Sequence, residues 1–452
     1  MNNMSDYQLR DTILELLLKI DKDTGYSHLV IDNAIKKNKI NPKDEGLLTE
    51  VVYGTIQRKL TLDYYIDSFI SQKKKLDDWV RMLLRLSLYQ MAFLDKIPDH
   101  AVIHEAVEIA KKRGHKGTAS FVNGILRNIQ RRGVPDTSEI NNDSKRLSVE
   151  TSHPQWLVER WIAEYGYETA KKMCEENLTR KAIAVRVQPL KISRGDAIKV
   201  LEQQGFEVKP SLFSEQGIII EKGNILKTNL FKDGYLTIQD QSSMLVAEML
   251  RVKPGMRVLD ACSAPGGKAT HIAEKMQNRG SIHAYDLHKK KVRLIQDKAS
   301  VLTLTNVEAN AMDARKLGGV HKDKSFDRIL VDAPCSGLGV IRGKPEIKYQ
   351  KQQSDIEKLS RIQLEILESV APLLKKNGLL IYSTCTVEKR ENEHVVRRFL
   401  ERNNNFEIDT TFFEELPEGL HTAQGITNLG LQLFPQNYRT DGFFLIRLIR
   451  KK

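Results

Sequence analysis

The feature that most constrains the fold is a change in hydrophobic spacing partway along the 452-residue chain. Over residues 1–140, apolar residues recur three and four positions apart, as they do on the buried faces of amphipathic helices. Such stripes begin at Ile13, Val80, Val102 and Phe121. From about residue 234 onward, short apolar runs alternate with helical patterns. The first region is therefore predicted to be an all-α bundle, and the second a doubly wound α/β domain.

The stretch between these regions mixes the two patterns. Residues 133–145 are polar and contain proline, as expected of a linker. Further on, residues 182–187 and 218–220 are typical of strands and residues 197–201 of a helix. We therefore predict three domains: a helical domain over 1–140, a small α+β linker module over 145–233 and a Rossmann-like α/β domain over 234–452.

Composition indicates the cellular location of the protein and the kind of partner it binds. No apolar stretch is long enough to span a bilayer, and residues 1–10 lack the apolar run of a signal peptide, which predicts a cytoplasmic protein. Of the net charge of +13, +9 falls in residues 241–452, which favours a polyanionic partner such as nucleic acid. Basic clusters in the helical region either contact RNA or end helices in solvent: Lys73–Lys75, Lys111–Arg113 and Arg131–Arg132.

The four cysteines exclude several kinds of site. They stand at positions 174, 262, 335 and 385, too few and too scattered for a disulfide framework in a chain of this length. None forms a C-x-x-C pair or lies near a histidine at zinc spacing. We therefore expect reduced cysteines and no metal site.

A glycine-containing turn between a predicted strand at 258–259 and a predicted helix ending at Lys275 marks a ligand site. In a doubly wound sheet, ligands bind where the strands end in such turns, and adjacent glycines let the backbone approach them. Acids follow the next two strands, at Asp286 and Asp313. The turn itself reads Asp260, Ala261, Cys262, Ser263, Ala264, Pro265, Gly266, Gly267, Lys268.

The composition of this turn selects among nucleotide-type ligands. An acid about 20 residues after the turn, such as Asp286, typically accepts hydrogen bonds from ribose hydroxyls. The turn lacks both the G-x-G-x-x-G pattern that cradles a pyrophosphate and the spacing of a P-loop. A cofactor with an adenosine group but no phosphates fits best, and S-adenosylmethionine is the predicted cofactor. The alternative is a tight turn with a purely structural role.

Two cysteines follow predicted strands of the same sheet. Cys335 comes after the strand at 328–331, within Asp332-Ala-Pro-Cys-Ser-Gly337. Cys385 comes after a strand at 379–382, which itself follows a helix predicted over 362–374 and closed by residues 375–378. Because both strands end at the ligand-binding edge, the two cysteines are predicted to be neighbours in space. A single cysteine in such a place is more often a small buried apolar residue.

A thiol at this edge suits methylation of carbon 5 of a pyrimidine. That carbon is a poor nucleophile until a thiolate adds to C6, and the thiol is eliminated after the C5 proton leaves. An acid near N3 or the exocyclic amino group stabilises the adduct, and Asp332 is placed for this role. A second thiol serves as a base or assists product release.

These motifs resemble those of the RNA cytosine-C5 methyltransferases of the NOL1/NOP2/Sun superfamily. Three further segments resemble the bacterial 16S rRNA cytosine-C5 methyltransferase B family (RsmB, Sun or Fmu): Phe121–Arg127, Ser152–Leu157 and Ile238–Ser243. The resemblance covers nearly the whole chain. The chain departs from the family at Lys344, where a histidine is usual, at Gly343, where a basic residue is common, and at Ser263, where alanine is commoner.

The resemblance implies a function and site roles. It implies a NusB-like RNA-binding first domain and S-adenosylmethionine-dependent methylation of cytosine 967 of 16S rRNA in the usual rRNA numbering. It implies that Cys385 is the nucleophile, that Cys335 assists catalysis or release, and that Lys268 is catalytic. The turn from Cys262 to Lys268, with Asp286, Asp313 and Asp332, contacts the cofactor or the target base. The expected substrate is free or early-assembly RNA, bound by a monomer without membrane or metal.

Other functions remain open at this point. One is methylation of a different rRNA or tRNA cytosine by the same chemistry. Another is a non-catalytic RNA-binding assembly or antitermination factor with a vestigial cofactor domain. The presence of Asp332, Cys335 and Cys385 argues against the second, and no candidate redox partner supports a thiol redox protein.

Overall fold

The computed structural model describes residues 6–22, 27–38, 40–71 and 75–451. It divides into two compact units, described here one at a time: residues 1–179 with 341–351, called the helical unit, and residues 180–340 with 352–452, called the sheet unit. The predicted division at 140/145 and 233/234 does not follow these packing units and remains a prediction. Within the described residues, no helix is long and apolar enough to cross a membrane.

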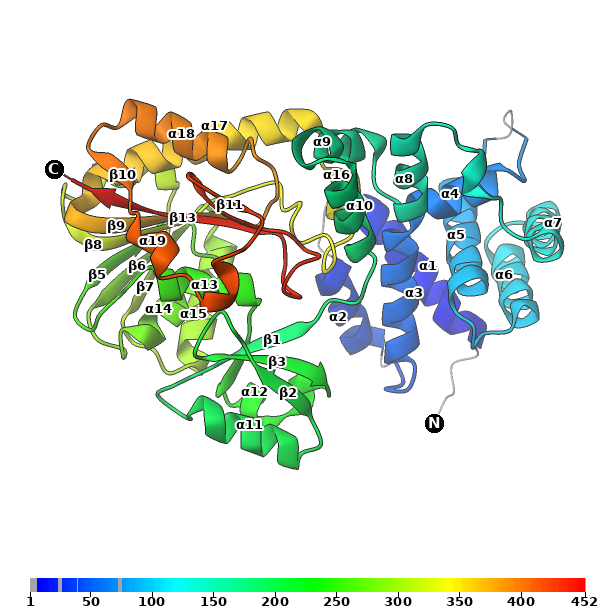
Figure 1. Ribbon diagram of the computed structural model, residues 1–452. Coiled ribbons are helices and arrows are strands. Elements are labelled where there is room, and N and C mark those ends of the chain that lie inside the picture. The colour runs from blue at the N-terminus through cyan, green and yellow to red at the C-terminus, as the bar shows by residue number, and fades with distance from the viewer. Residues whose placement is uncertain (1–5, 23–26, 39, 72–74, 452) are drawn as a thin grey trace. The chain divides into compact units, whose positions relative to one another are not determined.

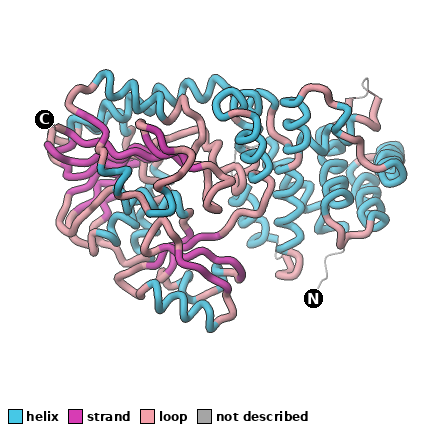
Figure 2. Tube along the Cα trace, viewed as in Figure 1, coloured by secondary structure: helices cyan, strands magenta, loops and turns pink. Residues whose placement is uncertain are grey.

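The helical unit consists of helices and loops over its described residues (Figure 2). The apolar stripes of the sequence form its core: Ile13, Leu83, Ile103 and Val122 are at most 1% exposed. Its elements are α1 (Asp6–Lys22), α2 (Ser27–Asn38), α3 (Glu45–Gln57), α4 (Lys59–Asp67), α5 (Asp78–Phe93), α6 (Asp99–Arg113), α7 (Lys116–Arg132), η1 (Thr137–Glu139), α8 (Asp143–Thr151), α9 (Gln155–Tyr165), α10 (Tyr167–Glu176) and, in the inserted segment 341–351, α16 (Ile347–Gln350).

Acidic side chains neutralise one of the basic clusters of this unit, Lys111–Arg113. Lys112 and Arg113 both form ion pairs with Asp11, and Lys111 pairs with Glu108. Lys73 and Lys74 lie outside the described residues. Whether these clusters contact RNA remains a prediction.

The sheet unit begins with a small antiparallel sheet in the order β2-β3-β1-β4. The buried apolar residues of β1, including Val185 and Val187, share a core with Ala197 and Leu201 of α11. The module comprises β1 (Ile183–Val187), α11 (Arg194–Gln203), β2 (Glu207–Pro210), β3 (Gly217–Lys222), η2 (Ile225–Lys227), α12 (Asn229–Lys232) and β4 (Leu236–Ile238). The strands and helix predicted in this stretch are confirmed.

The second sheet has the order β11-β12-β13-β9-β8-β5-β6-β7, with β10 paired to β13. The pairs from β9 through β7 are parallel, and β13 runs antiparallel to β9. Its strands are β5 (Arg257–Asp260), β6 (Ser281–Asp286), β7 (Val307–Ala311), β8 (Phe326–Asp332), β9 (Leu374–Thr384), β10 (Phe406–Ile408), β11 (Ile426–Thr427), β12 (Gly430–Leu433) and β13 (Phe443–Arg450).

Helices cover both faces of this sheet, as the alternating sequence pattern predicts. Figure 1 shows α17 and α18 along one face and α13, α14 and α15 on the other. The doubly wound arrangement is therefore confirmed, with an antiparallel addition at one side. The helices are α13 (Gln241–Met249), α14 (Gly267–Lys275), α15 (Lys289–Val301), η3 (Ala314–Gly319), α17 (Gln353–Val370), η4 (Ala371–Leu373), α18 (Glu393–Arg402), α19 (Thr411–Glu414) and η5 (Glu418–Leu420).

Two boundaries predicted from the sequence are wrong. The helix predicted over 362–374 begins at Gln353, where a capping box starts it, and ends at Val370. Residues 375–378, predicted to close that helix, belong to β9, whose register against β8 shifts there to accommodate extra residues.

The predicted linker over 133–145 contains a 3-10 turn and the start of α8, which Asn142 caps through its side chain.

Candidate active site

The turn from Asp260 to Lys268 joins β5 to α14, as the sequence predicts. Gly266 has φ +90°, a left-handed conformation that favours glycine, and a Cβ there would lie 3.0 Å from the Cα of Ile295. Gly267 opens α14, so the free backbone N–H groups of the first turn point toward the end of the sheet. The turn therefore brings backbone donors close to the carboxyl ends of the parallel strands.

Carboxylates from four strand ends converge on this turn. Burial raises the pKa of the Cys262 thiol well above its usual value, and Asp260, Asp332, Asp286 and Asp313 each raise it further. The four acids thus lie within electrostatic range of one point. Such a ring suits a cofactor that carries positive charge and ribose hydroxyls, as S-adenosylmethionine does, and disfavours one with phosphates.

Asp260 lies deepest among these acids. It is fully buried, and burial followed by the neighbouring charge of Asp332 raises its pKa to about 7. Asp286 accepts a hydrogen bond from the His288 N–H at 3.0 Å, and Asp313 is held by Arg315 at 2.7 Å.

A cleft of about 230 Å³ opens beside the turn. Several predicted site residues line it: Ser263, Ala264, Pro265, Gly267, Lys268, Asp332 and Cys385. Cys262, Gly266, Asp286, Asp313 and Cys335 are near it in the fold but are not among its lining residues. Most residues of the segment Ile238–Ser243 also line this cleft.

The two predicted cysteines meet at the ends of β8 and β9. Their Sγ atoms are 3.3 Å apart, and the strands that lead to them pair in parallel, with Asp332 opposite Ser383. The hydrogen bond with Cys385 is the largest cause that raises the pKa of the Cys335 thiol, followed by burial. Cys335 therefore keeps its proton at neutral pH.

A close backbone approach holds the loop of Cys335 against its neighbours. The Gly339 N–H donates to the Cys385 carbonyl at 3.0 Å, and the Gly442 N–H donates to the Gly339 carbonyl at 2.8 Å. A Cβ at Gly339 would lie only 1.9 Å from the Gly442 oxygen. No larger residue fits at position 339 without a shift of the backbone.

Lys268 and Asp332 form an ion pair at the mouth of the site. Lys268 Nζ donates to Asp332 Oδ2 at 2.7 Å, and Ser383 Oγ donates to Oδ1 at 2.8 Å. Burial lowers the pKa of Lys268, but the charge of Asp332 and its hydrogen bond outweigh burial and raise it above the usual value. The charge of Cys385 acts in the same direction. The Lys268 ammonium thus stabilises an anion at either Asp332 or Cys385.

Several residues around the cleft were not identified from the sequence. Lys298 and Phe443 line it, and burial lowers the pKa of Lys298 to about 8. Arg186 of β1 is fully buried, pairs with Glu274 at 2.7 Å and donates to the Gly267 carbonyl at 2.8 Å. The sequence signal for this contact was an arginine within an otherwise apolar predicted strand at 182–187.

The family stretch Arg342–Lys348 belongs to the helical unit rather than to this cleft. Arg342 pairs with Glu176, and the fully buried Lys348 donates to the Gln57 carbonyl at 2.8 Å. Burial lowers the pKa of Lys348 to about 7. The departures at Gly343 and Lys344 therefore lie in a segment that packs within the helical unit.

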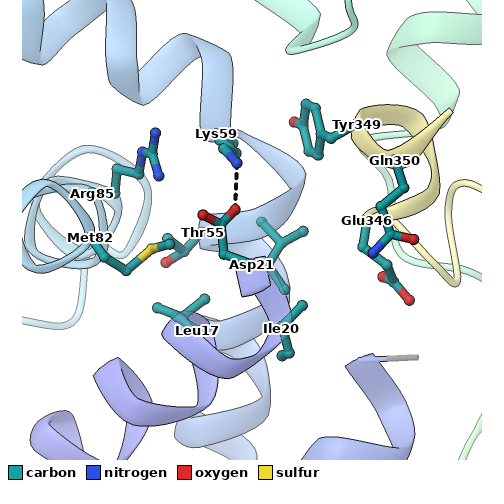
Figure 3. A pocket seen from close by; sticks show the side chains of 11 residues that line it. Leu17, Ile20, Asp21, Thr55, Lys59, Met82, Arg85, Glu346, Tyr349 and Gln350 are labelled. Atoms are coloured by element: carbon teal, nitrogen blue, oxygen red, sulfur yellow. Dashed lines mark hydrogen bonds and ion pairs between the residues drawn. The ribbon is translucent and has the colours of Figure 1, made fainter. Parts of the chain in front are cut away.

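A second cavity, of about 120 Å³, lies beside this segment within the helical unit (Figure 3). Lys59 and Asp21, which Figure 3 shows facing each other, pair at 2.5 Å. Arg85 makes a two-pronged pair with Asp63, and Glu346 accepts hydrogen bonds from Ser27. Each charged side chain that lines this cavity is therefore engaged in an ion pair or hydrogen bond. Among the described residues, no group of three or more potential metal ligands occurs in either unit.

Comparisons with known proteins agree along the whole chain. Residues 8–131 match the NusB family, residues 153–226 the RsmF/B-like ferredoxin-like domain, and residues 247–449 the 16S rRNA methyltransferase RsmB/F. The probable ribosomal RNA small subunit methyltransferase B of Bacillus subtilis is 48% identical over 99% of this chain and 100% of its own.

Two further proteins extend this agreement. The probable ribosomal RNA small subunit methyltransferase B of a Synechocystis species is 32% identical, over 96% of this chain and 97% of its own. The crystal structure of PH0851 superposes with a TM-score of 0.83 at 27% identity and covers 99% of this chain and 100% of that one.

Proposed function

The chain belongs to the RsmB/F family of 16S rRNA methyltransferases, and from that membership we propose that it methylates carbon 5 of one cytosine through a covalent cysteine adduct. Its cofactor is S-adenosylmethionine, and its substrate class is rRNA. The observation that carries the proposal is the pair of thiols 3.3 Å apart, beside the Lys268–Asp332 ion pair at the edge of the cleft.

The residues around the turn fit the cofactor. Asp260 and Asp332 would balance its positive charges, and Asp286 would accept hydrogen bonds from its ribose hydroxyls. Asp313 and the turn Cys262–Lys268 would make further contacts with it. S-adenosylmethionine supplies the methyl group, activated by the sulfonium. The chain's own residues would hold the target base beside the bound cofactor and exclude water.

Cys385 is the proposed nucleophile. It lines the cleft, and the Lys268 ammonium lies within range to stabilise its thiolate. Its sulfur forms a bond to C6 of the cytosine, which shifts electron density to C5. After methylation, a water molecule takes the C5 proton, the electron pair of the C5–H bond forms the C5–C6 double bond, and the C6–S bond breaks. Cys385 departs as a thiolate, 3.3 Å from the Cys335 thiol that can donate a hydrogen bond to it. Cys335, which keeps its proton in the resting site, acts in this release.

Asp332 stabilises the C6 adduct through an interaction with N3 or the exocyclic amino group of the cytosine. The ion pair with Lys268 and the hydrogen bond from Ser383 hold both carboxylate oxygens, so the side chain has little freedom to reorient. A preoriented group of this kind stabilises charge that develops during the reaction without a reorganisation cost.

The proposed substrate is free or early-assembly 16S RNA, with cytosine 967 as the target by family analogy. A base inside a duplex cannot reach Cys385, so the cytosine must leave its stack, most readily from a loop or a transiently unfolded segment. The NusB-like helices and the small ferredoxin-like module select the RNA. Basic residues of the sheet unit contact its phosphates, and the enzyme acts as a monomer.

Substitution of each cysteine tests the mechanism. Cys385→Ala should lower turnover more than about 10³-fold and form no adduct, because the nucleophile is gone. Cys335→Ala should form the adduct but retain the RNA, seen as a shifted band on a denaturing gel. An active Cys385→Ala enzyme would refute the mechanism. Bisulfite sequencing of rRNA from a deletion strain tests the target, which is wrong if cytosine 967 remains methylated.

A further inference from the structure

Glu391 and Asn392, in the loop between β9 and α18, contact both cysteine-bearing loops. Both residues are fully buried, and neither lines the cleft. The cysteines that these loops carry are 50 residues apart in sequence. Both cysteines lie in loops just beyond the ends of their strands, so contacts around those loops have to hold the sulfurs 3.3 Å apart.

Glu391 holds the loop of Cys335 from both sides. Its Oε2 accepts the backbone N–H of Ser336 at 2.8 Å and Nε2 of Gln363 at 2.9 Å. The same Gln363 nitrogen donates to the carbonyl of Pro334 at 2.9 Å. The residues before and after Cys335 are thus both tied to a single carboxylate oxygen, one directly and one through Gln363.

Asn392 holds the loop of Cys385 in the same way. Its Oδ1 accepts from Thr384 Oγ1 at 2.6 Å, and its Nδ2 donates to the Thr386 carbonyl at 3.2 Å and to Gln432 Oε1 at 2.8 Å. Thr384 and Thr386 flank Cys385. One peptide unit therefore joins the supports of the two loops.

The two loops are also linked directly. Ser336 Oγ and Thr386 Oγ1, each one residue beyond a cysteine, are 2.8 Å apart. The Tyr382 hydroxyl donates to the Glu391 carbonyl at 2.5 Å and so fixes the backbone of the support itself. The residues on either side of each cysteine are therefore hydrogen-bonded to Glu391 or Asn392, directly or through Gln363.

Burial of a carboxylate at position 391 costs more free energy than burial of a neutral side chain with the same hydrogen bonds. Its second oxygen, Oε1, is buried without a hydrogen-bond partner among the described residues, and burial raises the pKa of Glu391 to about 7. A glutamine would make the same contacts through its oxygen without the cost of a buried charge. The charge acts on the neighbouring thiol, because Glu391 adds to the causes that raise the pKa of Cys335.

We propose that Glu391 and Asn392 are positioning residues that hold Cys335 and Cys385 in register, and that the Glu391 carboxylate, which accepts the backbone N–H of the residue after Cys335, disfavours a negative charge on the Cys335 sulfur. The two cysteines are thereby made unequal: Lys268 stabilises a thiolate at Cys385, whereas Glu391 opposes one at Cys335. This inference rests on the proposed two-cysteine mechanism for its consequence in catalysis, but its electrostatic part is testable without RNA.

The first experiment measures the reactivity of Cys335 in the full-length protein. In a Cys385→Ser background, iodoacetamide alkylation at about pH 8.5 is followed by peptide mass spectrometry, which separates Cys335 from Cys174 and Cys262. Adding Glu391→Gln should accelerate alkylation of Cys335 about threefold to tenfold, because loss of a nearby anion favours the thiolate. The matched control is Glu393→Gln, whose carboxylate faces Lys389 and Arg397, and it should leave the rate unchanged.

The second experiment measures turnover in the otherwise native enzyme. Glu391→Ala and Asn392→Ala should lower kcat about tenfold or more, while the KM for RNA and the affinity for S-adenosylmethionine stay within twofold of wild type. Glu391→Gln should restore most of the Glu391→Ala loss, because it keeps the hydrogen bonds. Where an alanine variant does not fold, Glu391→Gln and Asn392→Asp, which preserve shape, are compared instead.

The outcomes distinguish the positioning role of Glu391 and Asn392 from the proposed covalent mechanism. An unchanged alkylation rate in Glu391→Gln, or alanine variants that turn over like Glu393→Gln, overturns the positioning pair. Parallel loss of cofactor binding and turnover also overturns it, since a general folding defect produces that result. If alkylation shifts as expected but the wild-type enzyme forms no RNA adduct, the pairing of Glu391 with Cys335 stands and the covalent mechanism falls.

Discussion

Both units of this protein bury a lysine beside a cysteine, and the two pairs behave in opposite ways. In the sheet unit, Asp332 more than offsets the effect of burial on Lys268, so the pKa of that lysine rises. In the helical unit, burial lowers the pKa of Lys348 to about 7, even though a negative charge on Cys174 acts in the opposite direction. Burial likewise raises the pKa of Cys174 to about 12.

The other residues around Lys348 and Cys174 in the helical unit make structural contacts. His153 contacts the Thr151 carbonyl at 2.8 Å and Asn177 at 3.2 Å, and burial lowers its pKa well below the usual value. Lys348 donates to a backbone carbonyl. A thiol with a lysine is therefore not by itself a catalytic site. The sheet unit adds a carboxylate, a second thiol and an open cleft.

The substitution with the largest expected effect on this contrast is Asp332→Asn. Loss of the carboxylate removes the partner of Lys268 and the group proposed to stabilise the adduct, so kcat should fall by about 10²-fold to 10³-fold. The matched control is Asp327→Asn, at the other end of β8, where the carboxylate pairs with Lys375 at 2.7 Å. Single-turnover assays should show full activity for that control. Equal losses in both variants would mean that strand stability, not the site, explains the effect.

The next test concerns the pH dependence of stability in the helical unit. The pKa of Lys348 is about 7 in the folded protein and 10.5 in an ordinary lysine, so the unfolded state binds the extra proton between these values. The free energy of unfolding should therefore rise as pH increases above 7, by up to about 1.4 kcal/mol per pH unit. Lys348→Met should abolish that rise.

Tryptophan fluorescence makes this measurement specific. All three tryptophans of the chain, Trp79, Trp156 and Trp161, belong to the helical unit. Urea unfolding followed by fluorescence at several pH values between 7 and 9.5 thus reports on this unit. Lys36→Met, at an exposed position of α2, is the control and should keep the wild-type slope. A slope that survives Lys348→Met would assign the titration to another group.

The smallest expected effect separates Cys174 from the cysteines of the site. Cys174→Ala should keep wild-type methylation and lower the free energy of unfolding by about 1 kcal/mol, because it leaves a small void in a packed core. Cys174 should also resist iodoacetamide in the folded protein, since its thiol is fully buried. Loss of methylation without loss of stability would place Cys174 in the catalytic machinery and erase the contrast.

Local patterns predicted much of this fold correctly. The helix after the turn ends at Lys275 as expected, and the predicted strand at 258–259 lies within β5. These elements depend on short-range periodicity, which a single sequence displays. The helix expected to end near residue 374 was wrong, because the lysines and glycine at 375–378 look like a helix terminus but form an irregular start of β9.

Residue types at strand ends, by themselves, determined the candidate site of this protein. Asp260, Asp332, Cys335 and Cys385 each follow an apolar run, and parallel strands bring their carboxyl ends to one edge. Tertiary structure alone decided which groups touch and which charges they feel. The 3.3 Å thiol pair, the Lys268–Asp332 ion pair and the support from Glu391 depend on register between strands distant in sequence. Local periodicity carries no record of such register, whereas burial and Coulomb interactions depend on it directly.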